Sequence, residues 1–281
     1  MKLKNDKGHV YVPDRSDIQT AIKRTTHLCI AAHQDDVEIM SYSAIAECYS
    51  DESKWFSAIV LTDGAGSPRD GEFASMTDEE MQKVRAKEQD NAAEIGKYSV
   101  MFQLGYPSSA VKNTGDGACA AELAEIIKAC APEFVFTHNP ADKHDTHVGV
   151  VMRTLEAIRF LPKESRPKNV YGLEVWRGLD WLGDEAKIIF DTASNPEIAE
   201  RLLSVFVSQC AGGKRYDLAT LGRRLANATF LASHAVDTTN SCTYGMDITE
   251  LIDNPDVVGF IGKHLDDLRN DIIMRIERTL N

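Results

Sequence analysis

The sequence lacks long hydrophobic runs. No stretch of its 281 residues approaches the roughly 18 apolar residues that a membrane-spanning helix requires. The N-terminal segment carries charges but no apolar core of a secretory signal, so we expect a cytoplasmic protein. Six scattered cysteines form no C-x-x-C pair, which favours reduced, mostly buried thiols over a disulfide framework or a structural zinc site.

Basic residues are also scarce relative to acidic ones. The chain has 31 Lys and Arg against 43 Asp and Glu, a formal net charge of −12, and the basic residues nowhere form a stripe. Because phosphate contacts need clustered basic side chains, this balance argues against nucleic acid as the main partner. It leaves a neutral small molecule or a bound cation open. With 43% apolar and 26% charged residues, the composition is typical of a globular protein.

Short apolar runs alternate with longer helical patterns in most of the chain. The runs predict strands at 27–32, 57–62, 98–104, 133–137 and 170–176, and helices fall between them at about 37–49, 77–95, 116–130 and 146–160. Thr77 and Gly96 are expected to begin and end the second of these helices. This rhythm predicts an α/β, Rossmann-like fold with a mostly parallel sheet and helices on both faces.

The last third of the chain has a different pattern. It reads as helical at 198–209, 216–235 and 257–280, with one short strand candidate at 187–190. No repeat or linker divides the sequence. We therefore expect a single domain over 1–281, with a core at about 25–210 and a helical C-terminal extension at about 211–281.

Two clusters of histidines and carboxylates follow predicted strands. They span residues 32–38 (A-H-Q-D-D-V-E) and 138–147 (H-N-P-A-D-K-H-D-T-H), and hold four of the eight histidines. In parallel sheets, sites form outside the carboxyl ends of the strands, and imidazole and carboxylate are ligands that zinc takes at an open site. Taken singly, a histidine after a strand is commonly structural, and Asp35-Asp36 is typical of a solvated turn or a helix N-cap. The two clusters together favour a metal site.

Both clusters resemble motifs of the PIG-L/LmbE-like family of zinc-dependent de-N-acetylases. Residues 32–38 resemble the family motif A-H-P-D-D-x-E, and Asp142-x-His144-x-x-His147 resembles its D-x-H-x-D-H. Supporting landmarks are T-D-G-A-G-S at 62–67, R-x-x-E at 85–88, L-G-Y-P at 104–107 and S-Q at 208–209. The resemblance covers about residues 25–210.

The resemblance implies a metal site and two reacting side chains. His33, Asp36 and His147 would bind Zn²⁺, with Fe²⁺ or another divalent metal as an alternative. Asp35 would act as the general base, and His144 would stabilise the oxyanion as an imidazolium.

The resemblance also suggests supporting residues. Asp142 and Asp145 would fix histidine tautomers, and Glu38 would orient the first motif. Arg85 would contact the substrate, although an ion pair with Glu88 on the same helix face is an equal alternative.

The sequence departs from the family pattern at two positions. Gln34 replaces the usual proline, which we expect to relax the loop without removing a ligand. Thr146 stands where an aspartate often precedes the last histidine, so one supporting carboxylate is absent. Neither change touches the five positions that the implied mechanism needs.

The implied function is zinc-dependent removal of an acetyl group from an N-acetylated amino sugar, such as N-acetylglucosamine, or from a sugar conjugate. The same residues would also serve a metal-dependent amidohydrolase of a non-sugar N-acyl substrate, or a metal-containing sugar-binding protein without turnover. Relatives that form trimers or hexamers leave a homo-oligomer open.

Overall fold

The protein is described by a computed structural model that covers residues 1–113, 115 and 117–280. Within these residues the strands form one eight-stranded sheet in the order β1-β4-β3-β2-β5-β6-β8-β7. The strands are β1 (His9–Tyr11), β2 (His27–Ala31), β3 (Phe56–Thr62), β4 (Met101–Tyr106), β5 (Phe134–His138), β6 (Asn169–Leu173), β7 (Lys187–Asp191) and β8 (Cys242–Asp247). The five strands from β4 to β6 are parallel. Strand β1 pairs antiparallel with β4, and β8 pairs antiparallel with both β6 and β7.

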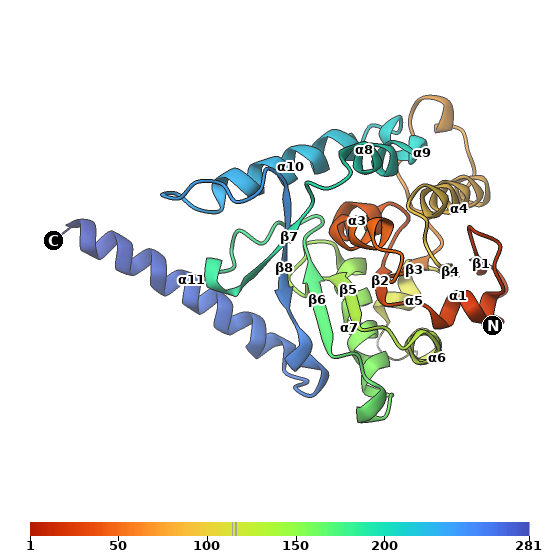
Figure 1. Cartoon of the computed structure of the whole chain (residues 1–281), viewed down its shortest axis with the longest axis horizontal. Coiled ribbons are helices and arrows are strands. Elements are labelled where there is room, and N and C mark those ends of the chain that lie inside the picture. The colour runs from red at the N-terminus through yellow and green to blue at the C-terminus, as the bar shows by residue number, and fades with distance from the viewer. Residues whose placement is uncertain (114, 116, 281) are drawn as a thin grey trace.

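Helices cover both faces of this sheet (Figure 1). They are α1 (Ile18–Lys23), α2 (Asp36–Met40), α3 (Tyr42–Ser50), α4 (Asp78–Ile95), α5 (Ser108–Lys112), α6 (Ala118–Cys130), α7 (Asp145–Arg159), α8 (Pro196–Ser204), α9 (Val207–Cys210), α10 (Tyr216–Phe230) and α11 (Val257–Leu280). One core cluster packs α1, α6 and α7 against the sheet, and a second packs α2, α3, α4 and α8 on the other face. The mostly parallel α/β fold is therefore confirmed.

The central strands follow from their composition. Every residue of β2 and β3 is buried, as expected for parallel strands that helices cover on both sides. Helix α4 begins with the expected Thr77, in a capping box with Glu80, and Gly96 is its C-cap.

The order of the strands creates a crevice between β2 and β5. From β2 the chain adds β3 and β4 on one side, and it then returns to add β5 and β6 on the other. Ligands bind at such a reversal, outside the carboxyl ends of the strands. Both motifs begin there, since the first follows β2 and the second follows β5.

Several elements differ from the prediction. The helix expected at 37–49 is two helices that break at Ser41, whose hydroxyl donates to the Cys29 sulfur at 3.1 Å. The C-terminal extension is helical in α10 and α11, but it also contributes β8, which the sequence pattern did not predict. The short edge strand β1 was likewise missed, and Asp116, the expected start of a helix, lies outside the described residues.

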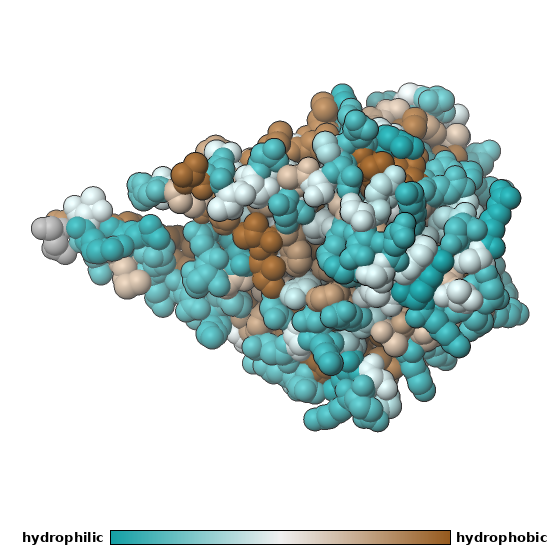
Figure 2. All heavy atoms as spheres, in the orientation of Figure 1, coloured by the Kyte–Doolittle hydropathy of each residue, from teal (hydrophilic) through white to brown (hydrophobic). Residues whose placement is uncertain are grey.

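The C-terminal helix α11 projects from the body (Figure 1). None of its residues is buried, and apolar atoms gather on the surface along α10 (Figure 2). Over the described ranges, no helix combines the length and the apolar character needed to cross a bilayer.

Candidate functional site

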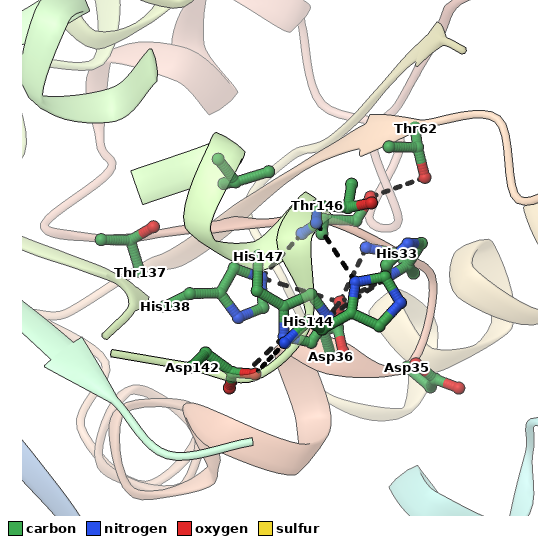
Figure 3. Close-up of polar contacts among 12 residues, drawn as sticks. His33, Asp35, Asp36, Thr62, Thr137, His138, Asp142, His144, Thr146 and His147 are labelled. Atoms are coloured by element: carbon green, nitrogen blue, oxygen red, sulfur yellow. Dashed lines mark hydrogen bonds and ion pairs between the residues drawn. The ribbon is translucent and has the colours of Figure 1, made fainter. Parts of the chain in front are cut away.

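Three predicted metal ligands converge in the crevice. The His33 Nδ1 lies 3.0 Å from Asp36 Oδ2, the His147 Nε2 lies 3.2 Å from the same oxygen, and the two nitrogens are 3.3 Å apart. Figure 3 shows these side chains facing one another. Ligand atoms held at 2.0–2.1 Å around a tetrahedral zinc ion are about 3.3 Å apart, so this donor set fits such an ion in both chemistry and spacing.

Local backbone structure sets this geometry. Asp36 is the first residue of α2, and its Oδ2 also accepts a hydrogen bond from the His33 backbone N–H at 2.8 Å. His147 lies in the first turn of α7 and is fully buried. Asp36 and His147 are thus held in the first turns of helices that follow β2 and β5, and His33 lies in the turn between β2 and α2.

The carboxylates and imidazoles of the cluster shift one another's pKa values. Burial alone would raise the pKa of Asp36, but His147 and His33 outweigh it and hold that pKa well below its usual value. Burial would lower the pKa of His147, but Asp36 and Asp142 outweigh it and raise the pKa to about 9. The carboxylates therefore favour positive charge at the centre of the cluster.

Asp142 occupies the supporting position that the motif suggests. Its Oδ2 lies 3.6 Å from the His147 Nδ1, on the far side of that ring from Asp36. The same carboxylate accepts hydrogen bonds from the backbone N–H groups of His144 at 2.9 Å and Trp176 at 3.2 Å. A carboxylate at Nδ1 leaves Nε2 directed to the cluster.

His144 lies beside the cluster of metal ligands, and its surroundings shift its pKa. Its ring stacks on His147 with centroids 4.6 Å apart, and its Nδ1 accepts the Thr146 backbone N–H at 3.2 Å. Burial, together with His147 and His33, lowers the pKa of His144. This direction favours a neutral ring over the expected imidazolium, and a ring whose proton is on Nε2 fits the acceptor role of Nδ1.

Asp35 stands apart from the ring cluster (Figure 3). Burial raises the pKa of Asp35 well above its usual value, although the charge of Arg85 opposes this shift. The Asp35 Oδ2 lies 3.3 Å from the guanidinium of Arg85. Both residues line the cavity in front of the cluster.

Arg85 turns toward the site and not toward Glu88. It is 4% exposed and donates hydrogen bonds to the Gln34 carbonyl and the Ser67 hydroxyl. The Glu88 carboxylate instead accepts the backbone N–H and the hydroxyl of Ser208, at 2.7 and 2.6 Å. The structure thus does not form the ion pair that was the alternative for Arg85.

Two other expectations are corrected. Asp145 is exposed and, among the described residues, makes no hydrogen bond or ion pair with a site histidine. It precedes His147 by two positions in α7, and residues at that spacing do not share a helix face. Gln34 does not loosen its loop, because its amide donates to Thr62 O at 3.3 Å and to Gln103 Oε1 at 3.2 Å.

Sequence reasoning assigned no role to two buried residues of the site. The His138 ring stacks on His147 at a centroid distance of 3.9 Å, and its Nε2 accepts the Ala32 N–H at 2.9 Å. It also belongs to a second possible metal-binding group, with Asp36 and His147. Gln89 accepts the Asp35 N–H, although nothing in the sequence separates it from other helical glutamines.

A cavity of about 600 Å³ opens over the cluster. His33, Asp35, Asp36 and His144 line its floor, and the loop at 62–68 lines one side, with Trp176 and Tyr216 also in the wall. This volume is within the usual range of about 300–1,000 Å³ for small-molecule sites. The arrangement places titratable groups and a set of metal ligands at one accessible point.

The family comparison agrees with this geometry. Residues 28–158 match the PIG-L family, described as GlcNAc-PI de-N-acetylase. These residues form a PIG-L domain. The three predicted metal ligands, together with Asp35, Arg85 and His144, lie within it. The match supports a deacetylase. A search of curated proteins finds no match to the chain.

Solved structures share the fold of the PIG-L domain and the surrounding chain. N,N'-diacetylchitobiose deacetylase from Pyrococcus horikoshii has a TM-score of 0.65 at 17% identity, over 85% of this chain and 89% of that chain. GalB, the 4-carboxy-2-hydroxymuconate hydratase from Pseudomonas putida, has a TM-score of 0.60 at 19% identity, over 80% of this chain and 96% of that chain. The zinc-inhibited form of teicoplanin deacetylase Orf2 has a TM-score of 0.56 at 15% identity, over 79% of this chain and 97% of that chain. The hydratase shows that this fold also serves a different reaction, so the argument for function must come from the site.

Proposed function

We propose that this protein is a metal-dependent hydrolase that removes the acetyl group from an N-acetylated amino sugar or sugar conjugate. The observation that carries the proposal is the set of three ligand atoms of His33, Asp36 and His147, spaced 3.0–3.3 Å apart beneath an open cavity. The PIG-L domain and the fold shared with a chitobiose deacetylase support this substrate class.

His33, Asp36 and His147 would hold one divalent ion. When bound, such an ion polarises an acyl carbonyl and lowers the pKa of water toward about 7. Zn²⁺ suits two imidazoles and a carboxylate, and Fe²⁺ or another divalent metal is the alternative. The zinc-inhibited state of a protein with this fold makes the identity of the metal a necessary measurement.

The reacting groups of the chain are Asp35 and His144. The Asp35 carboxylate accepts a proton from the attacking water and returns it to the amide nitrogen as the C–N bond breaks, which yields acetate and a free amine. His144 donates its Nε2–H to the oxyanion, because its Nδ1 is already occupied by the Thr146 N–H. Arg85 restrains Asp35 and contacts polar groups of the substrate.

We further propose that residues 1–281 act as one catalytic unit with a core at about 25–210. Strand β8 supports this view, since it comes from the C-terminal extension and pairs with both β6 and β7 of the sheet. The substrate is a small molecule, and assembly into a homo-oligomer is compatible with the exposed face of α11.

The test is an acetate- and amine-release screen of the purified protein after loading with Zn²⁺ or Fe²⁺. The panel contains N-acetyl sugars, their conjugates and N-acyl amino acids. Acetate release from an N-acetyl sugar supports the proposal. Release from the amino acids alone would assign a non-sugar amidohydrolase, and bound metal without release from any substrate would assign a binding protein.

A further inference from the structure

The backbone of Asp35 has an unfavourable conformation. Its φ of 92° and ψ of −33° lie outside the regions that residues with a side chain usually adopt. Asp35 is the N-cap of α2, yet its side chain makes no capping hydrogen bond. The conformation separates two consecutive carboxylates, because Asp36 joins the ring cluster while Asp35 stands apart from it (Figure 3). Neighbouring groups must hold this backbone in place.

A buried chain of hydrogen bonds supplies that restraint. The Asp35 backbone N–H donates to Gln89 Oε1 at 3.2 Å, and Gln89 Nε2 donates to Glu38 Oε1 at 2.8 Å. Tyr98 donates its hydroxyl to the same Glu38 oxygen at 2.7 Å. Gln89 and Glu38 are fully buried, and Tyr98 is nearly so. The chain therefore runs from the start of α2 to α4 and back to α2, out of contact with solvent.

The chemistry of the chain determines how Gln89 is oriented. The Glu38 carboxyl oxygen accepts two hydrogen bonds, so the amide nitrogen of Gln89 faces it. The amide oxygen of Gln89 then faces the Asp35 backbone N–H, which donates to it. A side chain with a donor and an acceptor at this spacing is needed to join the Asp35 N–H to Glu38.

We propose that Gln89, oriented by Glu38, is a positioning residue that holds Asp35 so that its carboxylate faces the cavity. This inference rests on the proposed function for its kinetic consequence, because the placed group is the general base. Gln89 itself is not among the residues that line the cavity, and it belongs to neither possible metal-binding group of the described residues. Its effect on the reaction would pass through Asp35.

The principal variant is Gln89→Met, which keeps the length of the side chain and removes both hydrogen bonds. We expect kcat to fall about 10- to 100-fold, since displacement of a reacting group by about 1 Å has effects of that order, while KM and the bound metal change little. The matched control is Thr25→Val, which also removes two hydrogen bonds of a buried side chain while keeping its shape. Thr25 precedes the amino end of β2, opposite the site, and its hydroxyl hydrogen-bonds to Ser57 Oγ at 2.7 Å and to the Ala21 carbonyl at 3.5 Å. That control should keep kcat within about two-fold, because no hydrogen bond to the general base is lost.

Two further variants separate positioning from a general loss of structure. Glu38→Gln keeps a carbonyl oxygen for Gln89 and Tyr98 and should retain most of the activity. In an Asp35→Ala background, Gln89→Met should leave the residual rate nearly unchanged, because the group that it positions is already absent. An equal fold-loss in both backgrounds would overturn the proposal.

A readout without substrate keeps the inference distinct from the proposed function. Amide hydrogen exchange of the Asp35 N–H should accelerate at least 10-fold in Gln89→Met relative to wild type, because that group loses its acceptor, whereas the Asp36 to Met40 amides should change little. Unchanged exchange at Asp35 would overturn the inference even if acetate release is observed. Accelerated exchange in a protein that releases no acetate would support the positioning role and refute the assigned reaction.

Discussion

Strand β8 can be tested at Gly245, where its backbone lies close to side chains of β6 and β7. Gly245 pairs with Leu173 of β6 and with Ile188 of β7. A Cβ at this position would lie 2.5 Å from Phe190 Cε2 and 2.8 Å from Leu173 Cδ2, about 1 Å inside the usual carbon–carbon contact of about 3.5–4.0 Å. Overpacking of this kind costs about 1–3 kcal/mol, and relief of the glycine entropy returns about 0.5–1 kcal/mol. We therefore expect Gly245→Ala to lower the free energy of unfolding by about 1 kcal/mol, within a range of about 0–2.5 kcal/mol.

A matched glycine should respond in the opposite direction. Gly222 lies in the interior of α10, and a Cβ there would meet no atom within 4 Å. Gly222→Ala should raise the free energy of unfolding by about 0.5–1 kcal/mol, because alanine loses less backbone entropy in a helix. Urea denaturation measures both variants. In a Phe190→Leu background the cost of Gly245→Ala should shrink, since the main clash is with that ring. A Gly245→Ala protein as stable as wild type, without coupling to Phe190, would refute the placement of β8 beside β7.

Two more predictions concern a buried acid and the metal ligands. Burial raises the pKa of Glu174 above its usual 4.5, so over a range of pH above 4.5 the folded state keeps a proton that the unfolded state has lost. The free energy of unfolding therefore falls as pH rises from 4.5 toward the pKa of the folded state. Glu174→Gln keeps an oxygen that accepts the Tyr244 N–H. Denaturation at several pH values should show that its stability relative to wild type increases as pH rises over that range. A difference in stability that does not change with pH would contradict the raised pKa of Glu174. His33→Ala should lose bound metal in an elemental analysis, while His234→Ala, at an exposed loop position, should retain it, and equal metal contents would contradict the ligand set.

Apolar runs and helix caps in the sequence predicted the central strands and helix α4. Strands β2 and β3 are continuous apolar runs because helices cover both of their faces, and α4 carries its own start and stop signals at Thr77 and Gly96. Strand β8 has no comparable signal. Its glycine and polar residues suit pairing with β6 and β7, whose positions along the chain are remote, and tertiary packing overrides the weak local preference.

The site divides in the same way. The two motifs were predictable because the carboxyl ends of adjacent parallel strands lie together, which brings His33 and His147 to one crevice. The role of Gln89 was not, since its hydrogen bond to Asp35 spans 54 positions and depends on how α4 packs. Asp145 shows the converse error: proximity to a motif suggested a role, but the helix turns its side chain to solvent.

The most direct test of the proposed reaction is Asp35→Ala in the metal-loaded protein. Acetate release from the best N-acetyl sugar of the screen and bound metal are measured together. We expect kcat to fall by about 10²–10⁴, the usual contribution of general acid–base catalysis, with the metal content unchanged because Asp35 is not one of the three ligands. An Asp35→Ala protein that releases acetate at the wild-type rate would contradict the mechanism.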